Sequence, residues 1–284
     1  MDSLRIGCVK YLNARPLIRG WPGNVEFDHP SALCQRLASG QLDVALVSSF
    51  EFLRNPIYRI VDDISISSDG PVYSVVVAHR AEISEMEEIE LDPASETSVN
   101  LLRCLLVERR LTPRFARGVL GSTGCQSATG RIRHGEPVLA GRLPATHRAH
   151  LLIGDQAIQF RQKHAGEFQF WDLGEQWKKL TGLPFVYALW LIRPEVTEAK
   201  SIAQRLRKLR DKNLANIDEL ITDTAAGAAD VDKEKITGEF LARYYHRHLR
   251  FSFGESEKQG LQAFARLCAK HGLLPSRDPV FSVV

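Results

Sequence analysis

The chain has 284 residues, of which 44% are hydrophobic and 25% are charged. This balance is typical of a globular protein, and the length allows one large domain or, more readily, two lobes. The 37 basic and 34 acidic residues leave a net charge of only +3, which argues against a nucleic-acid partner.

No stretch of the sequence is apolar for long enough to span a membrane, and a strand-like pattern begins at once, without a signal peptide. We therefore expect a cytoplasmic protein that makes no membrane contact. The five cysteines are spread along the chain and form no Cys-x-x-Cys pair. This favours buried, reduced thiols over disulfides or structural zinc.

The first strand is predicted at residues 4–8, and Pro16 predicts a helix that begins shortly after it. Asn13 and Arg15 therefore follow the carboxyl end of a strand, which is where ligands bind in open α/β sheets. Two interpretations of Asn13 stay open here, a ligand-binding group or the cap of the following helix.

A helix is expected at 31–39 and a buried strand at 42–47. That strand ends in two hydroxyl side chains, Ser48 and Ser49. They are placed like Asn13, at the carboxyl end of a strand, and so join it as candidates for ligand binding.

The β-branched run at 72–78 predicts another strand, in which Ser74 is the one small polar residue. A hydroxyl in a buried strand needs a hydrogen-bond partner. Ser74 is therefore expected to bond either the backbone or a ligand.

Three hydroxyl side chains crowd the start of a helix predicted from residue 99 onward: Ser95, Thr97 and Ser98. The free N–H groups and the positive dipole end of a helix N-terminus attract anions. The alternative is a helix that Ser95 simply caps.

Residues 118–149 show little periodicity, and we expect loops and short elements there. His147 and His150 lack an acidic or cysteine companion at ligand spacing, so no metal site is predicted. A buried strand at 151–153 follows, and Asp155 is expected to cap the next helix rather than to face a cleft.

Further along the chain, the pattern predicts a strand at 168–173, a helix at 175–180 and a long buried strand at 185–192. Helices follow from residue 197 to the end, and Tyr244 lies on the apolar face of one of them. This alternation predicts an α/β fold with a largely parallel sheet.

The long strands at 72–78 and 185–192 each follow a Gly- and Pro-containing break. If both cross between lobes, residues 1–75 and 193–284 form one lobe and residues 76–192 form the other. A ligand would then bind in the cleft between the lobes, where pockets are common.

Six motifs occur in a characteristic order along much of the chain, and together they identify a resemblance. They lie at 11–17, 40–49, 70–75, 92–98, 152–155 and 172–185. Their order resembles the menaquinone-biosynthesis proteins of the futalosine route, specifically the chorismate dehydratase (MqnA) branch. The sequence departs from the family's usual pattern mainly in 118–149, which is longer and richer in arginine.

This resemblance implies a fold like that of the type II periplasmic binding proteins, with two α/β lobes around a ligand cleft. It implies a hydro-lyase that converts the small dianion chorismate to 3-[(1-carboxyvinyl)oxy]benzoate and water without a cofactor or metal. It also points to Asn13 and Ser74 as the residues nearest the chemistry.

The two carboxylates of such a substrate would need donors on both sides of the cleft. Ser95, Thr97 and Ser98 suit one carboxylate, and Ser48 and Ser49 could take the other. Arg15 is a further candidate for substrate binding, with a structural ion pair as the alternative.

No His, Lys or Glu in the six motifs is an obvious general base. The base is therefore either a carboxylate of the substrate itself or a residue outside the motifs. Two other functions stay open: the sister enzyme that cleaves cyclic dehypoxanthine futalosine, and a non-catalytic solute-binding protein of the same fold.

Overall fold

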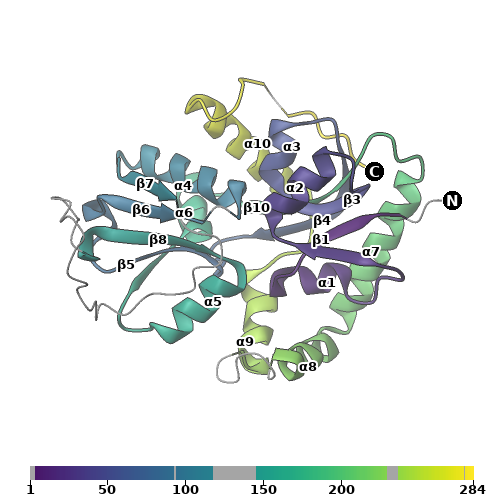
Figure 1. Ribbon diagram of the computed structural model, residues 1–284, viewed down its shortest axis with the longest axis horizontal. Helices are drawn as coiled ribbons and strands as arrows, with labels where there is room; N and C mark the ends of the chain where they lie inside the picture. The colour runs from purple at the N-terminus through teal and green to yellow at the C-terminus, as the bar shows by residue number, and fades with distance from the viewer. Residues whose placement is uncertain (1–3, 93, 118–144, 229–235, 278) are drawn as a thin grey trace, which may run out of the picture.

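The computed structural model describes residues 4–92, 94–117, 145–228, 236–277 and 279–284. Most of the segment for which we expected loops, residues 118–149, lies outside the described residues. The described part contains two five-stranded sheets that lie beside each other, with helices around both (Figure 1).

The first sheet has the strand order β2-β1-β3-β10-β4. Its strands are β1 (Ile6–Val9), β2 (Val25–Asp28), β3 (Val44–Ser48), β4 (Arg59–Ser68) and β10 (Phe185–Ile192). Val44 to Val47 and the whole of β10 are apolar, and all but one of these side chains are buried, as expected for central strands covered on both faces.

The second sheet has the strand order β7-β6-β8-β5-β9. Its strands are β5 (Val75–His79), β6 (Glu88–Leu91), β7 (Arg114–Arg117), β8 (Arg148–Ile153) and β9 (Gln169–Asp172). The strand predicted at 72–78 begins later than expected, so Ser74 lies in the connection that leads into β5.

Both sheets are mixed, so the prediction of a largely parallel sheet was wrong. Strand β10 runs antiparallel to β3 and β4, and β5 runs antiparallel to β8 and β9. The chain enters each of these strands directly from the other sheet. It therefore starts at the edge where the neighbouring strands end, and it must run in the opposite direction.

The chain passes between the sheets at 69–74 and again at 182–184. The lobe boundaries expected from the sequence, 1–75 with 193–284 and 76–192, stay a proposal. If the lobes follow the sheets, β10 belongs with the first lobe, and the second boundary lies before residue 185.

Helices cover both sheets. They are α1 (Arg15–Ile18), α2 (Pro30–Ala38), α3 (Ser49–Arg54), α4 (Glu96–Glu108), α5 (Gly154–Lys163), α6 (Leu173–Thr181), α7 (Ala199–Ala215), α8 (Ile217–Ala228), α9 (Gly238–Arg243) and α10 (Glu255–Lys270). Shorter turns are η1 (Leu12–Ala14), η2 (Ile83–Glu85), η3 (Ala145–His147) and the π-helical η4 (Tyr244–His248).

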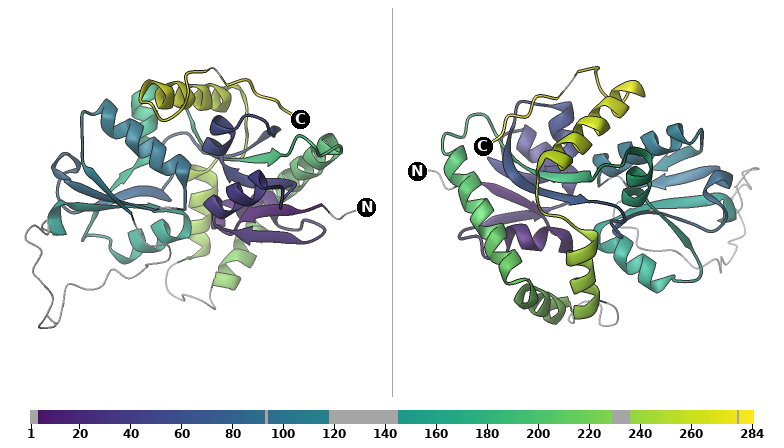
Figure 2. Two further views of the ribbon diagram at one scale, coloured as in Figure 1. Left: turned by 45° about the horizontal axis from the view of Figure 1, so that its top comes forward. Right: turned by 180° about the vertical axis from the view of Figure 1, so that it is seen from behind.

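Helix α10 bridges the two halves of the molecule (Figure 2). The ring of Phe264 lies 6.3 Å from Phe50 on α3, 5.0 Å from Phe185 on β10 and 6.0 Å from Trp177 on α6. Because these rings come from elements of both sheets, burial of Phe264 stabilises the arrangement of the two sheets as well as the helix itself.

Gly260 lies where α10 packs against the chain that passes between the sheets. A Cβ at this residue would overlap the carbonyl group of Pro184. We expect Gly260→Ala to lower the free energy of unfolding by about 1–3 kcal/mol, because backbone cannot move aside as a flexible side chain can.

Urea unfolding would measure this effect. Gly238→Ala on α9 is the matched control, since a Cβ there meets only Ile221 at an ordinary 3.7 Å. An unchanged midpoint for Gly260→Ala would show that α10 does not need this close approach.

Candidate functional site

A pocket lies between the two sheets and contains about 520 Å³ of empty space, part of it open to solvent. It is lined by Val9, Tyr11, Asn13, Pro30, Ser48, Ile66, Val72, Ser74, Val75, Ser95, Ser98, Ile153, Gly154, Tyr187 and Ala188.

Asn13 enters this pocket from the 3-10 turn η1, directly after the first strand. Its Oδ1 atom is buried and has no hydrogen-bond partner among the described residues. An unpaired buried amide oxygen costs about 1–3 kcal/mol, so a ligand that donates a hydrogen bond here would remove that cost. The alternative interpretation of Asn13 as a helix cap fails, since no side-chain cap bond is made at η1 or α1.

Ser74 lies opposite, at the entry to β5, and its side chain is fully buried. Its Oγ accepts a hydrogen bond of 2.7 Å from the Tyr244 hydroxyl. Burial raises the pKa of Tyr244, so the phenol stays protonated and remains a donor. Because Ser74 accepts this bond, its own proton is free to point into the pocket.

Three hydroxyl side chains form a buried joint between β3 and α4. Ser48 Oγ and Thr97 Oγ1 are hydrogen-bonded to each other, and the Phe50 amide donates to Thr97 Oγ1 at 3.1 Å. Ser49 Oγ donates to the Val186 carbonyl at 2.7 Å. Of the three, Ser48 alone lines the pocket. Thr97 joins α4 to the end of β3, and Ser49 bonds to β10 of the first sheet.

The start of α4 carries the remaining predicted donors. Ser95 caps the helix, accepting from the Ser98 amide at 3.3 Å, and both side chains line the pocket. The capping interpretation is therefore confirmed. Both residues still line the pocket although Ser95 caps the helix, and they lie beside a helix N-terminus that favours negative charge.

Arg15 is not among the residues that line the pocket. Its positive charge acts instead on Asp155 and Tyr245. Its role in substrate binding stays a prediction. In the alternative, a structural role, Arg15 would act on Asp155 and Tyr245.

Asp155 does not cap α5, contrary to the sequence prediction. It lies inside the first turn of that helix, and its Oδ1 accepts a hydrogen bond of 2.9 Å from the amide of Leu12. Burial raises the pKa of Asp155 to about 6, although the Leu12 bond and the charges of Arg15 and Lys10 act in the opposite direction. A half-buried carboxyl next to a pocket, with a displaced pKa, is a frequent mark of a functional site.

The titratable residues in the described lining of the pocket are two tyrosines, Tyr11 and Tyr187. Burial raises the pKa of both phenols. The described lining therefore offers neutral hydrogen-bonding groups and the N-terminus of α4, with no carboxylate, imidazole, amine or thiol in direct contact.

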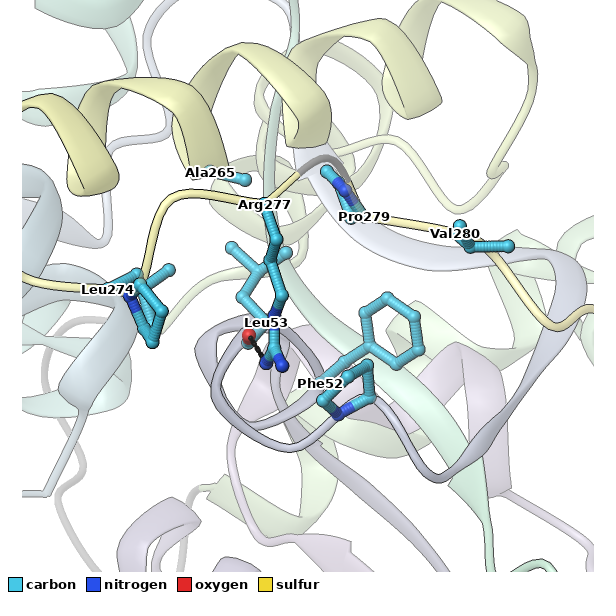
Figure 3. Close-up of a pocket in the computed structure, with 9 residues that line it drawn as sticks. Phe52, Leu53, Ala265, Leu274, Arg277, Pro279 and Val280 are labelled. Atoms are coloured by element: carbon cyan, nitrogen blue, oxygen red, sulfur yellow. Dashed lines mark hydrogen bonds between the residues drawn. The ribbon is translucent and has the colours of Figure 1, made fainter.

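A second pocket lies at the surface between α3 and the chain after α10 (Figure 3). It is mostly apolar, and its one charged lining residue, Arg277, donates to the carbonyl oxygens of Leu53 and Arg54 at 2.9 Å each. With these donors occupied, this pocket has less to offer a polar ligand than the one between the sheets.

No group of three or more potential metal ligands occurs among the described residues. His147 is instead bonded to Glu87, which directly precedes β6, and His150 to Glu90 on β6, at 3.0 Å each. Within the same part of the chain, no helix has both the length and the apolar character needed to cross a membrane.

The family model described as menaquinone biosynthesis matches residues 4–270 of this chain. The chain belongs to this menaquinone-biosynthesis family. The match covers both sheets and all of α10, so the pocket between the sheets lies within it.

Two curated relatives are similar to this chain over most of their length. A chorismate dehydratase of Thermus thermophilus is 29% identical, with 92% of this chain and 93% of the relative aligned. A chorismate dehydratase of Campylobacter jejuni is 24% identical, with 91% and 90% aligned.

Solved structures confirm the periplasmic-binding-protein-like fold. A protein from Archaeoglobus fulgidus has a TM-score of 0.69 at 17% identity, covering 96% of this chain and all of the other. The alkanesulfonate-binding protein of Xanthomonas axonopodis pv. citri, solved with MOPS bound, has a TM-score of 0.65 at 16% identity, with 99% and 97% covered.

Proposed function

We propose that this member of the menaquinone-biosynthesis family is a hydro-lyase that dehydrates chorismate to 3-[(1-carboxyvinyl)oxy]benzoate and water. The observation that carries the proposal is the unpaired amide oxygen of Asn13 in a pocket of neutral donors between the sheets. Full-length similarity to two chorismate dehydratases supports the choice of substrate.

The proposed reaction removes the proton at C3 and the hydroxyl at C4 of the substrate ring, which becomes aromatic. Aromatisation supplies a large driving force, so the protein needs chiefly to hold the dianion and to assist the departure of hydroxide. The Asn13 amide can accept from the C4 hydroxyl through Oδ1 and donate through Nδ2 to the negative charge that develops on the departing oxygen.

Ser74 has a related role in this proposal. Its free proton can reach a substrate oxygen, because the Tyr244 hydroxyl already occupies its acceptor side at 2.7 Å. A donor held in one direction before the reaction stabilises developing charge without reorganisation.

The carboxylates are assigned to the two hydroxyl-bearing ends of the pocket. Ser95 and Ser98 lie at the N-terminus of α4, where one carboxylate would meet the positive end of the helix dipole. Ser48, at the end of β3, is the donor proposed for the other carboxylate.

Removal of the proton at C3 is assigned to a carboxylate of the substrate itself, which acts as the base. The two ionisable residues in the described lining, Tyr11 and Tyr187, are neutral phenols whose raised pKa values make them poor bases. An internal carboxylate needs only to be held at the right distance, which is the kind of catalysis that positioning supplies.

Incubation with chorismate, followed by ultraviolet absorbance, tests this function directly. We expect a new aromatic absorbance and a product identical to 3-[(1-carboxyvinyl)oxy]benzoate. Turnover of cyclic dehypoxanthine futalosine instead would show the sister activity, and binding of chorismate without turnover would show a solute-binding protein.

A further inference from the structure

The two residues that begin α5 contact both segments on which the proposed chemistry depends. The Gly154 amide donates to the backbone carbonyl of Ser74 at 2.8 Å, and Asp155 Oδ1 accepts from the Leu12 amide at 2.9 Å. Leu12 directly precedes Asn13 in the turn η1. One end of a single helix therefore holds the backbone of Ser74 and the backbone next to Asn13.

The peptide groups on both sides of Leu12 are held in place. Its amide is bound by Asp155, and its carbonyl accepts a hydrogen bond of 2.9 Å from the hydroxyl of Tyr245. These bonds restrict the backbone dihedral angles of the turn. The direction in which the Asn13 side chain leaves the turn depends on those angles.

We propose that Asp155 is a positioning residue that holds the Leu12 amide and thereby aims the Asn13 amide into the pocket. This inference rests on the proposed function for its meaning in catalysis. Asp155 itself is not among the pocket-lining residues, so it acts on Asn13 through the backbone of the turn.

A carboxylate suits this task because a hydrogen bond from an amide to a charged acceptor is stronger than one to a neutral acceptor. Asp155 belongs to the helix that follows β8, and Leu12 follows β1, so their bond joins elements of the two sheets. The position of Asn13 is thereby coupled to the approach of the two sheets around the pocket.

Several ionisable groups face Asp155 from neighbouring elements. The cations are Arg15 and Lys10, and the phenols are Tyr11, Tyr244 and Tyr245. Burial raises the pKa of these phenols, so they stay neutral through the acidic range. The pKa of about 6 therefore places the titration of Asp155 itself between pH 5 and 7.

The test compares Asp155→Ala with Asp155→Asn. We expect the alanine variant to lower kcat for chorismate about 10-fold or more with little change in KM. A displaced Asn13 amide would stabilise the transition state less and leave substrate binding intact. The asparagine variant keeps an acceptor oxygen without its charge, so its kcat should lie between those of the wild type and the alanine variant, near the level that the wild type reaches at low pH. Gln156→Ala, at the next position of α5, is the matched control and should behave like the wild type.

The pH profile separates positioning from general support of the fold. In the wild type, kcat should fall as the pH drops through about 6, because protonation of Asp155 removes the charged acceptor. Asp155→Asn cannot titrate and should show no such fall. A wild-type kcat in Asp155→Ala, or the same acidic fall in Asp155→Asn, would overturn the proposal.

Hydrogen–deuterium exchange of the peptide covering residues 9–17 provides a readout that needs no substrate. Exchange there should be fastest in Asp155→Ala, intermediate in Asp155→Asn, and close to wild type in Gln156→Ala. If the wild type does not turn over chorismate, the proposed function fails, and this exchange alone decides whether Asp155 holds the turn; unchanged exchange in Asp155→Ala would refute it.

Discussion

Asn13→Ala is expected to lower kcat for chorismate by about 100- to 1000-fold, the loss typical of removing one donor to developing negative charge. The KM should change little, because the carboxylates are held by other groups at the start of α4 and the end of β3. Steady-state kinetics measures both quantities, and calorimetric titration with the aromatic product measures retained binding.

Asn216→Ala is the control for this variant. The Asn216 side chain lies at the end of α7 and donates to the Lys212 carbonyl of the same helix, at 2.8 Å. We expect wild-type kinetics from it. An unchanged kcat in Asn13→Ala would contradict the role assigned to the amide, and a lost product affinity would move that role from catalysis to binding.

Ser74→Ala is the second large effect that we expect, with kcat about 10- to 100-fold lower, since a hydrogen bond to a charged group contributes about 1.5–3 kcal/mol. The same change leaves the fully buried hydroxyl of Tyr244 without its partner. The variant should therefore also unfold at a lower urea concentration.

Tyr244→Phe separates the two consequences. It keeps the Ser74 hydroxyl in the pocket but removes the donor that directs it, so we expect a smaller loss of kcat than in Ser74→Ala. Ser65→Ala is the control, because Ser65 is a buried serine of β4 that bonds to the Ser252 carbonyl, away from the pocket. A wild-type kcat in Ser74→Ala would exclude the serine from the chemistry.

Local patterns predicted many of the elements well. The apolar run at 185–192 coincides with β10, and the hydroxyl-rich start at 95–98 became a helix that Ser95 caps. These features depend on neighbouring residues, through side-chain periodicity and capping bonds, and such interactions can be recognised along a chain.

Part of the candidate site was also accessible from sequence. Asn13 and Ser48 follow strand ends, and the ordered motifs connected them with Ser74, Ser95 and Ser98; the structure brings all five to one pocket. Arg15, Ser49 and Thr97 belong to the same motifs, yet the structure places them outside the lining. A motif groups residues that are close in sequence, whereas the direction of each side chain depends on the turn that carries it.

The residues that support the site were not recognised from sequence. Asp155 was interpreted as a helix cap and Tyr244 as part of an apolar helix face. Their partners, Leu12 and Ser74, are 143 and 170 residues away along the chain. No local pattern records a hydrogen bond between residues so far apart.

The sequence by itself determined the family, the α/β class and the polar groups that would meet a small anion. The tertiary structure decided which of those groups share one pocket, in which direction the two long strands run, and which distant residues hold Asn13 and Ser74. The reason is physical: periodicity, caps and motifs reflect neighbours along the chain. A pocket between two sheets is formed by contacts that exist only after the chain has crossed between them twice.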